Sequence, residues 1–173
     1  DALVLATGSV PFVPPVPGAT GEGRFVYRTV EDLEAIKQYA GRSRRGVVIG
    51  GGLLGLEAAQ ALQTLGLDTT VVEFAPRLMP VQVDAGGGEA LRRLVEGLGV
   101  QVLLGASTQE IAPTDDGLRL TFADGSTLDT DMVVFSAGIR PADALARAAE
   151  LDTGERGGVT VDVGCLTSAP DVY

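Results

Sequence analysis

The sequence predicts an α/β fold, in which a central parallel sheet is completed through a three-stranded antiparallel meander. The first observation is the unbroken apolar run at 46–50, which is typical of a strand buried on both faces of a parallel sheet. The second is that apolar side chains continue at helical spacing over 54–65 and that a β-rich run follows at 69–73, which completes a strand–helix–strand unit. The third is that polar and apolar residues alternate after residue 106, between the turn signals DDG and ADG, as antiparallel hairpins require.

The composition narrows the chemistry that the chain can carry. Its 173 residues correspond to about one domain, and 13 Lys and Arg against 23 Asp and Glu give a net charge of −10. That charge argues against binding to nucleic acid or to an anionic membrane. The absence of histidine and the single cysteine argue against zinc sites, Ser–His pairs and disulfide frameworks, so no metal ligand and no catalytic side chain is expected.

Signals for membrane insertion or export are not visible in the sequence. The longest apolar run, 46–56, is much shorter than the roughly twenty residues that span a bilayer. No charged segment followed by an apolar one opens the chain, so no signal peptide is expected. We therefore expect a soluble cytoplasmic protein.

The N-terminal part is expected to be largely extended. Residues 2–5 form an apolar run, which predicts a buried strand that stops at Thr7 and Gly8. The prolines between residues 11 and 17 then exclude a regular helix and predict a linker. Thr29 is a suitable N-cap for a helix that continues to residue 39 and ends at Gly41.

Caps, turns and periodicity predict the remaining elements. Gly66 is expected to end the helix of the strand–helix–strand unit, and Asp84 is expected to cap a helix that ends near residue 99. Three glycines at 86–88, in the first turn of this second helix, should make that end fray. Further strands are predicted at 100–104, 107–111, 118–122, 126–128, 132–135 and 159–163, with a short helix within 141–151.

A glycine-rich turn is the clearest functional signal. Gly50, Gly52 and Gly55 form a Gly-x-Gly-x-x-Gly pattern directly between a predicted strand and a predicted helix, which is the context of a dinucleotide-binding turn. In a Rossmann-like fold the first glycine permits the tight turn, the second lets the backbone approach a pyrophosphate, and the third allows close packing of helix on strand. The free N–H groups of the helix N-terminus would hold the phosphates. A glycine turn that serves packing alone is the alternative.

Glu73 is the second signal, because it ends the next strand 21 residues after Gly52. An acid about twenty residues beyond the turn accepts from the ribose hydroxyls of the adenosine, and its charge would repel a 2′-phosphate. NADH is therefore favoured over NADPH, unless Glu73 is only an exposed charge at a strand end. Arg77, four residues further on, could soften this discrimination. Glu57 lies in the first turns of the helix, where an acid also has a purely structural explanation.

Taken in order, the motifs resemble the pyridine nucleotide–disulfide oxidoreductases, flavoproteins in which an NAD-binding domain is inserted into an FAD-binding domain. The resemblance covers essentially the whole chain and rests on the strings LVLATGS, VPFVPPVPG, YRTVEDLEAI, VVIGGGLLGLEAA, VVFSAGIRP and GGVTVDVGCLTSAPDVY. Within the family, VVIGGGLLGLEAAQAL and VVEFAPRLMPVQVD are most similar to the assimilatory NAD(P)H-dependent nitrite reductases. The resemblance implies an FAD-domain strand, linker and connecting helix at 1–41, an NAD(P)H-binding domain at 42–140, and a return segment into the FAD domain at 141–173.

The resemblance also implies cofactor contacts at individual residues. Glu57 matches a helix glutamate that lies towards the nicotinamide, and Gly138 matches a backbone contact to the same cofactor. Thr7, Gly8 and Arg28 match positions beside FAD. Together with the reasoning above, the expected NAD(P)H contacts in the turn, the next strand and the loop after it are Gly50, Gly51, Gly52, Leu53, Leu54, Gly55, Glu73 and Arg77.

The activity that the resemblance implies is delivery of a hydride from NAD(P)H to FAD, in an enzyme of the nitrite reductase kind. The family's N-terminal flavin fingerprint, its Ala-x-Gly-Asp motif and a cysteine pair are missing from this sequence. FAD is therefore expected in the full-length protein, and this piece is expected to be inactive by itself. An iron–sulfur cluster and sirohaem are likewise expected only in missing regions.

Other functions stay open at this point. The same domain could belong to a ferredoxin or rubredoxin reductase or to an NADH oxidase. It could also sense NADH without chemistry, although a sensor would not need the flavin-side segments, or bind another nucleotide-derived ligand. The expected partners are NAD(P)H and the FAD domain of the same chain, and a homodimer of the full-length protein remains open.

Overall fold

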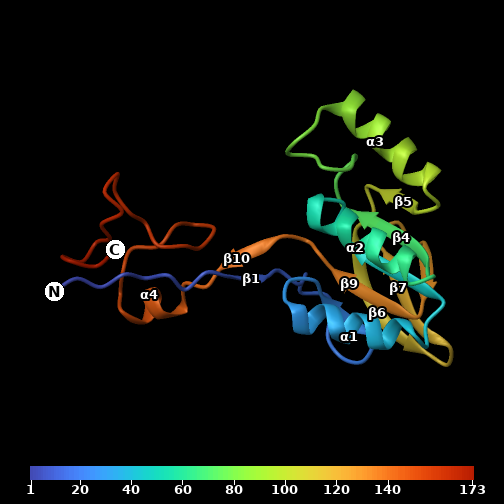
Figure 1. Cartoon of the computed structure of the whole chain (residues 1–173), viewed down its shortest axis with the longest axis horizontal. Coiled ribbons are helices and arrows are strands. Elements are labelled where there is room, and N and C mark those ends of the chain that lie inside the picture. Colours follow the sequence, from blue (N-terminus) through green and yellow to red (C-terminus); the bar gives the residue numbers. More distant parts are fainter. The chain divides into compact units, whose positions relative to one another are not determined.

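The computed structural model describes every residue, 1–173, and divides the chain into two compact units (Figure 1). The larger unit, Pro11–Gly138, contains the parallel sheet, the meander and the three long helices. The smaller unit combines Asp1–Val10 with Ile139–Tyr173. The short strands β1 (Ser9–Pro11) and β10 (Ile139–Pro141) pair. In the smaller unit, α4 (Ala144–Ala148) is the short helix expected within 141–151. None of the helices has the length and apolar character that a membrane span needs.

The larger unit is built on a five-stranded sheet in which every pair of neighbours is parallel. The strand order is β2-β9-β3-β4-β5, with β3 at the centre. The chain runs from β3 outwards to β4 and β5 on one side, whereas β9 and β2 lie on the other side, so the strand order reverses between β3 and β9. The bounds of the strands, in sheet order, are Arg24–Val26, Met132–Phe135, Arg45–Ile49, Asp68–Glu73 and Gln101–Leu104.

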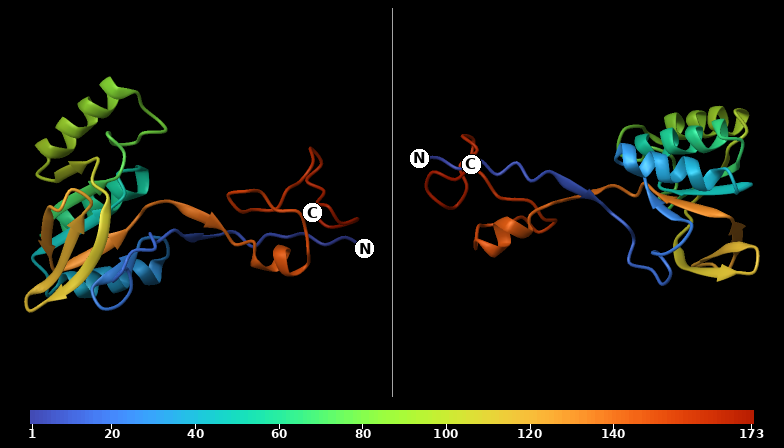
Figure 2. Two further views of the ribbon diagram at one scale, coloured as in Figure 1. Left: turned by 180° about the vertical axis from the view of Figure 1, so that it is seen from behind. Right: turned by 60° about the horizontal axis from the view of Figure 1, so that its bottom comes forward.

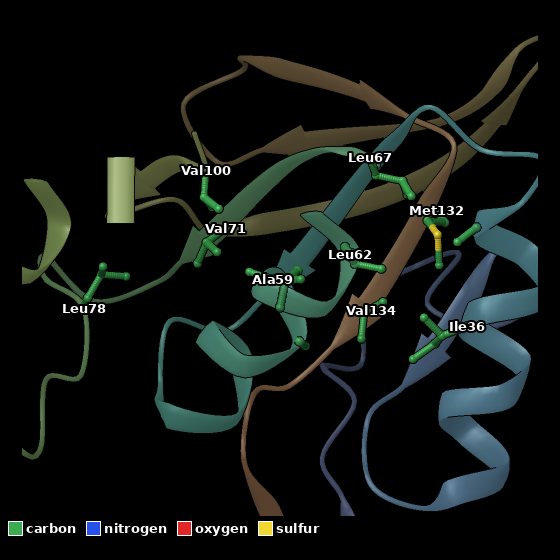
Figure 3. Packing of buried hydrophobic residues seen from close by; sticks show 12 residues of the cluster. Ile36, Ala59, Leu62, Leu67, Val71, Leu78, Val100, Met132 and Val134 are labelled. Carbon is green, nitrogen blue, oxygen red and sulfur yellow. The ribbon is translucent and has the colours of Figure 1, made fainter. Parts of the chain in front are cut away.

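Three helices pack on one face of this sheet: α1 (Val30–Ala40), α2 (Leu53–Thr64) and α3 (Ala85–Gly97). Alternate residues of a strand point to opposite faces, and Val48 of β3 and Val134 of β9 point to the helices. Figure 3 shows how side chains of the helices and of the sheet interdigitate in this layer. Its fully or nearly fully buried members include Ile36, Ala59, Leu62, Val71, Leu78, Met132 and Val134.

The opposite face of the sheet is covered by the antiparallel meander of β6 (Thr108–Thr114), β7 (Gly117–Phe122) and β8 (Thr127–Thr130). Figure 2 shows the helices and the meander on opposite sides of the sheet. The second core lies between these layers and consists of Val47, Ile49, Val72, Ile111, Leu118, Leu120, Phe122, Val133 and Phe135. The predicted α/β class, the parallel sheet and the meander are therefore confirmed.

The predicted helix caps are present. Thr29 caps α1 in a capping box, because its hydroxyl accepts from the Asp32 N–H while the Asp32 carboxylate accepts from the Thr29 N–H. Asp84 caps α3 by accepting from the Gly87 N–H at 2.7 Å. Gly66 follows the last residues of α2 with φ +89°, the left-handed conformation that ends many helices.

Two predicted strands are wrong. Residues 2–5 form only the single bridge Leu3↔Val172 and are not buried, since Leu3 and Val4 are 55% and 71% exposed. Residues 159–163 form only the bridge Thr153↔Val159, and the side chains of Val161 and Val163 face solvent. Apolar or alternating runs become strands only where a neighbouring strand supplies a series of hydrogen-bond partners. A single bridge does not supply such a series. The opposite omissions are β1, β2 and β10, whose three residues each are too few to give a periodic signal.

Candidate functional site

The predicted site residues of the larger unit lie mainly along the carboxyl edge of its parallel sheet. The glycine turn directly follows β3, Ser136–Gly138 follow β9, and Arg28 lies two residues after β2. Glu73 is the last residue of β4. Ligands of open α/β sheets bind outside this edge, where the strand order reverses, and here that reversal lies between β3 and β9. The larger unit therefore presents the glycine turn, Glu73 and Gly138 along one edge.

Packing explains three glycines of the turn. Gly50 has φ +120°, and a Cβ atom there would lie 2.3 Å from the carbonyl oxygen of Ser136. A Cβ atom on Gly55 would lie 1.9 Å from the carbonyl oxygen of Gly50, so this glycine allows α2 to approach the turn. On Gly51 it would lie 2.6 Å from a methyl carbon of Leu78. Any side chain at these positions would force the backbone or its neighbours to move.

Gly52 differs from its neighbours because the space beside it is open. A Cβ atom at this position would have no heavy atom within 4 Å, and the backbone is extended, with φ −81°. Gly52 is also the N-cap of α2, and no side chain caps the helix there. The first N–H groups of a helix have no partner within the helix, so those of Leu53 and Leu54 are available beside this space. An anion, such as a pyrophosphate, fits these donors and the positive end of the helix dipole.

Glu73 lies beside the turn and is held there by two backbone groups. Its Oε2 atom accepts from the N–H of Gly51 at 2.6 Å, and its Oε1 atom accepts from the N–H of Ala75 at 2.7 Å. A carboxylate offers about four acceptor positions, so roughly half of them remain for hydroxyl groups of a ligand. The side chain is half-buried, and the two amides fix its orientation.

The loop from β4 to α3 packs against the glycine turn at Gly51. The Met79 N–H donates to the carbonyl oxygen of Gly51 at 2.9 Å, and Leu78 is fully buried against the turn. Residues 78 and 79 were not expected to take part. The signal that could have indicated them is an apolar Leu-Met pair within a loop that two prolines mark as irregular.

Arg77, expected as a cofactor contact, instead has a visible role within this loop. Its Nε and Nη2 atoms donate to the carbonyl oxygens of Val83 and Pro80, at 3.1 and 3.0 Å. Its aliphatic stem packs on Gly88, where a Cβ atom would lie 2.9 Å from the Arg77 Cβ. This contact explains one of the three glycines in the first turn of α3. A contact between Arg77 and a cofactor stays a prediction.

The other expected contacts are distributed over both units. Glu57 is exposed on the first turns of α2, and Gly138 has φ +102° with open space where a side chain would begin. Arg28 is exposed after β2. Thr7 and Gly8 belong to the smaller unit, where the Gly8 carbonyl oxygen accepts from the Ala142 N–H at 2.9 Å. Their expected flavin contacts stay predictions.

A cavity of about 760 Å³ lies at the opposite, amino-terminal edge of the sheet, and we do not assign the site to it. Four of its charged lining residues already form ion pairs, Arg42 with Glu22 and Arg45 with Asp131, both at 2.7 Å. The glycine edge, in contrast, offers helix N–H groups without partners and a carboxylate with spare acceptor positions. We therefore assign the candidate site to the glycine edge.

Comparison with known proteins decides the family. Residues 1–173 match the family described as pyridine nucleotide-disulphide oxidoreductase. The chain belongs to this family. It is 63% identical over 172 residues to the nitrite reductase [NAD(P)H] large subunit of Klebsiella oxytoca, covering 99% of this chain and 18% of that protein. It is 53% identical over 175 residues to the nitrite reductase (NADH) large subunit of Escherichia coli K12, covering 100% and 21%.

Solved structures of the family have the same fold. The water-forming NADH oxidase from Lactobacillus brevis, bound to NADH, superposes with a TM-score of 0.93 at 28% identity, covering 100% of this chain and 38% of that one. The chain spans about a fifth of the length of the curated nitrite reductase relatives that it matches. Membership implies FAD and NAD(P)H as the cofactors of the parent enzymes. The predicted family and the similarity to nitrite reductases are confirmed.

Proposed function

We propose that this chain is the NAD(P)H-binding part of a nitrite-reductase-like flavoprotein and that it binds NADH in preference to NADPH. One observation carries the proposal. The glycine turn is closed by packing at Gly50, Gly51 and Gly55 and open at Gly52, and the Gly51 N–H holds the Glu73 carboxylate beside it. In this proposal residues 42–140 bind NAD(P)H, and residues 1–41 and 141–173 belong to the FAD-binding domain. The 63% identity to the Klebsiella protein supports the nitrite reductase assignment.

Each group at the carboxyl edge has a role in holding the dinucleotide. The N–H groups at the start of α2, which Gly52 leaves accessible, would donate to the pyrophosphate. Glu73 accepts from the ribose hydroxyls of the adenosine with its remaining acceptor positions, and its negative charge opposes a 2′-phosphate. Glu57 and Gly138 would contact the nicotinamide half. Thr7, Gly8 and Arg28 are each assigned an FAD contact, as the resemblance implies.

The chain contributes position rather than proton transfer. When bound, NADH would supply a hydride and FAD would be its acceptor. Because that step needs no acid or base from the protein, the absence of histidine causes no difficulty. We assign the iron–sulfur cluster, the sirohaem and the reduction of nitrite to parts of the protein outside this chain, and we place the protein in the cytoplasm.

Calorimetric titration of the chain with NADH and NADPH tests this proposal. We expect NADH to bind more tightly, and we expect Glu73→Ala to bring the ratio of the two dissociation constants towards one. The ratio is the informative quantity. Glu73→Ala also removes the hydrogen bond that holds the Gly51 N–H, and any resulting disturbance of the turn would weaken the binding of both cofactors alike. Asp68→Ala, an exposed acid at the other end of β4, is the control and should leave the ratio unchanged. An unchanged ratio in Glu73→Ala would remove Glu73 from ribose recognition.

An NADH oxidase is the second candidate, because the Lactobacillus brevis enzyme shares this fold so closely. The two functions differ in what accepts the electrons from the flavin. NADH consumption by the full-length protein that depends on nitrite supports the first function. Consumption that depends on oxygen alone supports the second.

A further inference from the structure

Phe74 is the aromatic residue whose exposure the fold does not explain. It follows Glu73 directly at the carboxyl end of β4, and it is 76% exposed. The other four phenylalanines of the chain are buried or half-buried, and two of them, Phe122 and Phe135, belong to the second core. A Phe ring in water forgoes the hydrophobic stabilisation that burial supplies. Its place beside the ribose-binding acid suggests a ligand as its partner.

The backbone on both sides of Phe74 is firmly held. The carbonyl oxygen of Glu73 accepts from the Ala106 N–H, and that of Ala75 accepts from the Gly105 N–H, both at 3.0 Å. The Ala75 N–H in turn donates to the Glu73 carboxylate at 2.7 Å. These three bonds fix the segment between β4 and its neighbour β5. The backbone that carries the ring is therefore held in place, so that ligand binding does not have to order this segment.

The space beside Gly105, which pairs with this segment, is open. Gly105, which donates to the residue after Phe74, has φ +65°, and a Cβ atom there would meet no heavy atom within 4 Å. In the proposed binding mode Glu73 holds the adenosine ribose, and the adenine is attached to that same ribose. The base therefore has to lie within one sugar of Glu73. Phe74 is the next residue along the chain, and Gly105 donates to the residue after it.

We propose that Phe74 is a binding residue for the adenine ring, which stacks on its exposed face at the carboxyl end of β4. This inference rests on the proposed dinucleotide function and deepens it, because it assigns the base as well as the ribose and the phosphates. Stacking of a base on an aromatic ring changes affinity by about 5- to 150-fold when the ring is removed. The contact recognises adenine in NADH and NADPH alike, and it is absent for a nicotinamide mononucleotide.

The test is calorimetric titration of the chain with NADH, with AMP and with reduced nicotinamide mononucleotide. We expect Phe74→Ala to weaken NADH and AMP by the same factor, about 5-fold or more, and to leave the mononucleotide unchanged. Phe74→Tyr should restore both affinities, whereas Phe74→Leu, which keeps an apolar side chain without a ring, should restore them only in part. Val81→Ala removes another exposed apolar side chain of the same loop, 90% exposed, and should change nothing.

The outcomes separate this inference from the function on which it rests. If the wild-type chain binds NADH and Phe74→Ala binds it equally well, the adenine contact is wrong and the dinucleotide function stands. An equal loss for the mononucleotide would also overturn the contact, since it would show a general disturbance of the site. A wild-type chain that binds neither NADH nor AMP would overturn both. Because Phe74 is exposed, thermal unfolding of its variants should match that of the wild type.

Discussion

Replacing Gly52 by alanine separates the binding role of the glycine turn from its packing role. The added methyl group would meet no protein atom within 4 Å, and φ −81° is a conformation that alanine adopts without strain. Alanine is a poorer N-cap than glycine, which costs about 1 kcal/mol at most. The variant should therefore fold with nearly wild-type stability. Gly55→Ala is the contrasting change, because its methyl group would lie 1.9 Å from the Gly50 carbonyl oxygen.

The magnitude follows from what the Gly52 methyl group would exclude. It would occupy the space through which a phosphate approaches the N–H groups of the first turn of α2. A hydrogen bond to a charged group contributes about 1.5–3 kcal/mol, so the loss of one such bond weakens binding by about 10- to 150-fold. Both NADH and NADPH should lose this factor, since they share the pyrophosphate. For Gly55→Ala we expect destabilisation of about 1–3 kcal/mol or more, from overpacking.

Two measurements on each variant check this reasoning. Urea denaturation gives the free energy of unfolding, and calorimetric titration gives the dissociation constant of NADH. Gly52→Ala should change the second and spare the first, and Gly55→Ala should change the first. Wild-type affinity in a folded Gly52→Ala variant would refute the placement of the pyrophosphate. A Gly55→Ala variant as stable as the wild type would refute the packing argument.

Four further variants test stability by urea denaturation. Hydrogen bonding to Arg92 helps lower the pKa of Glu89 from 4.5 to about 2, so ionised Glu89 stabilises the fold above pH 4.5. This stabilisation is lost as Glu89 is protonated. The difference in unfolding free energy between wild type and Glu89→Gln should therefore shrink as the pH falls from 4.5 to 2. Asp131→Ala should cost about 2–3 kcal/mol, because this carboxylate, 19% exposed, accepts four hydrogen bonds. Asp129→Ala, which breaks an exposed ion pair, should cost much less. Gly86→Ala should stabilise the chain by about 0.5 kcal/mol, since the nearest atom to the new methyl group is 3.6 Å away.

Much of the larger unit could be predicted because its signals are local. The strand at 46–50, the glycine turn and the helix after it lie within one continuous stretch, and their order alone indicates a Rossmann-like unit. The meander was likewise marked by two turn signals and by alternation. Residues 2–5 and 159–163 carry the same kind of local pattern, yet they are not strands. Their patterns say nothing about whether a partner strand is available, and here each finds a single bridge.

The position of the predicted ribose acid followed from spacing, but its environment did not. The parallel register Ile49↔Val72 places the residues that follow β3 next to the end of β4, so the Gly51 N–H meets the Glu73 carboxylate. That register is a property of the assembled sheet and cannot be read from either segment alone. Arg77 is a similar case, because sequence distance placed it near the cofactor while its hydrogen bonds go to loop carbonyls.

The two hydrogen bonds that the Glu73 carboxylate accepts from backbone N–H groups limit how this site can be redesigned for NADPH. Exchanging the acid for a neutral or basic residue would remove the charge that opposes a 2′-phosphate. It would also leave the N–H groups of Gly51 and Ala75 without their acceptor, and Gly51 is buried, so the exchange would cost about 1–3 kcal/mol in the resting protein. A successful redesign must supply a new acceptor for those amides, or keep Glu73 and introduce the phosphate-binding cation at a neighbouring position.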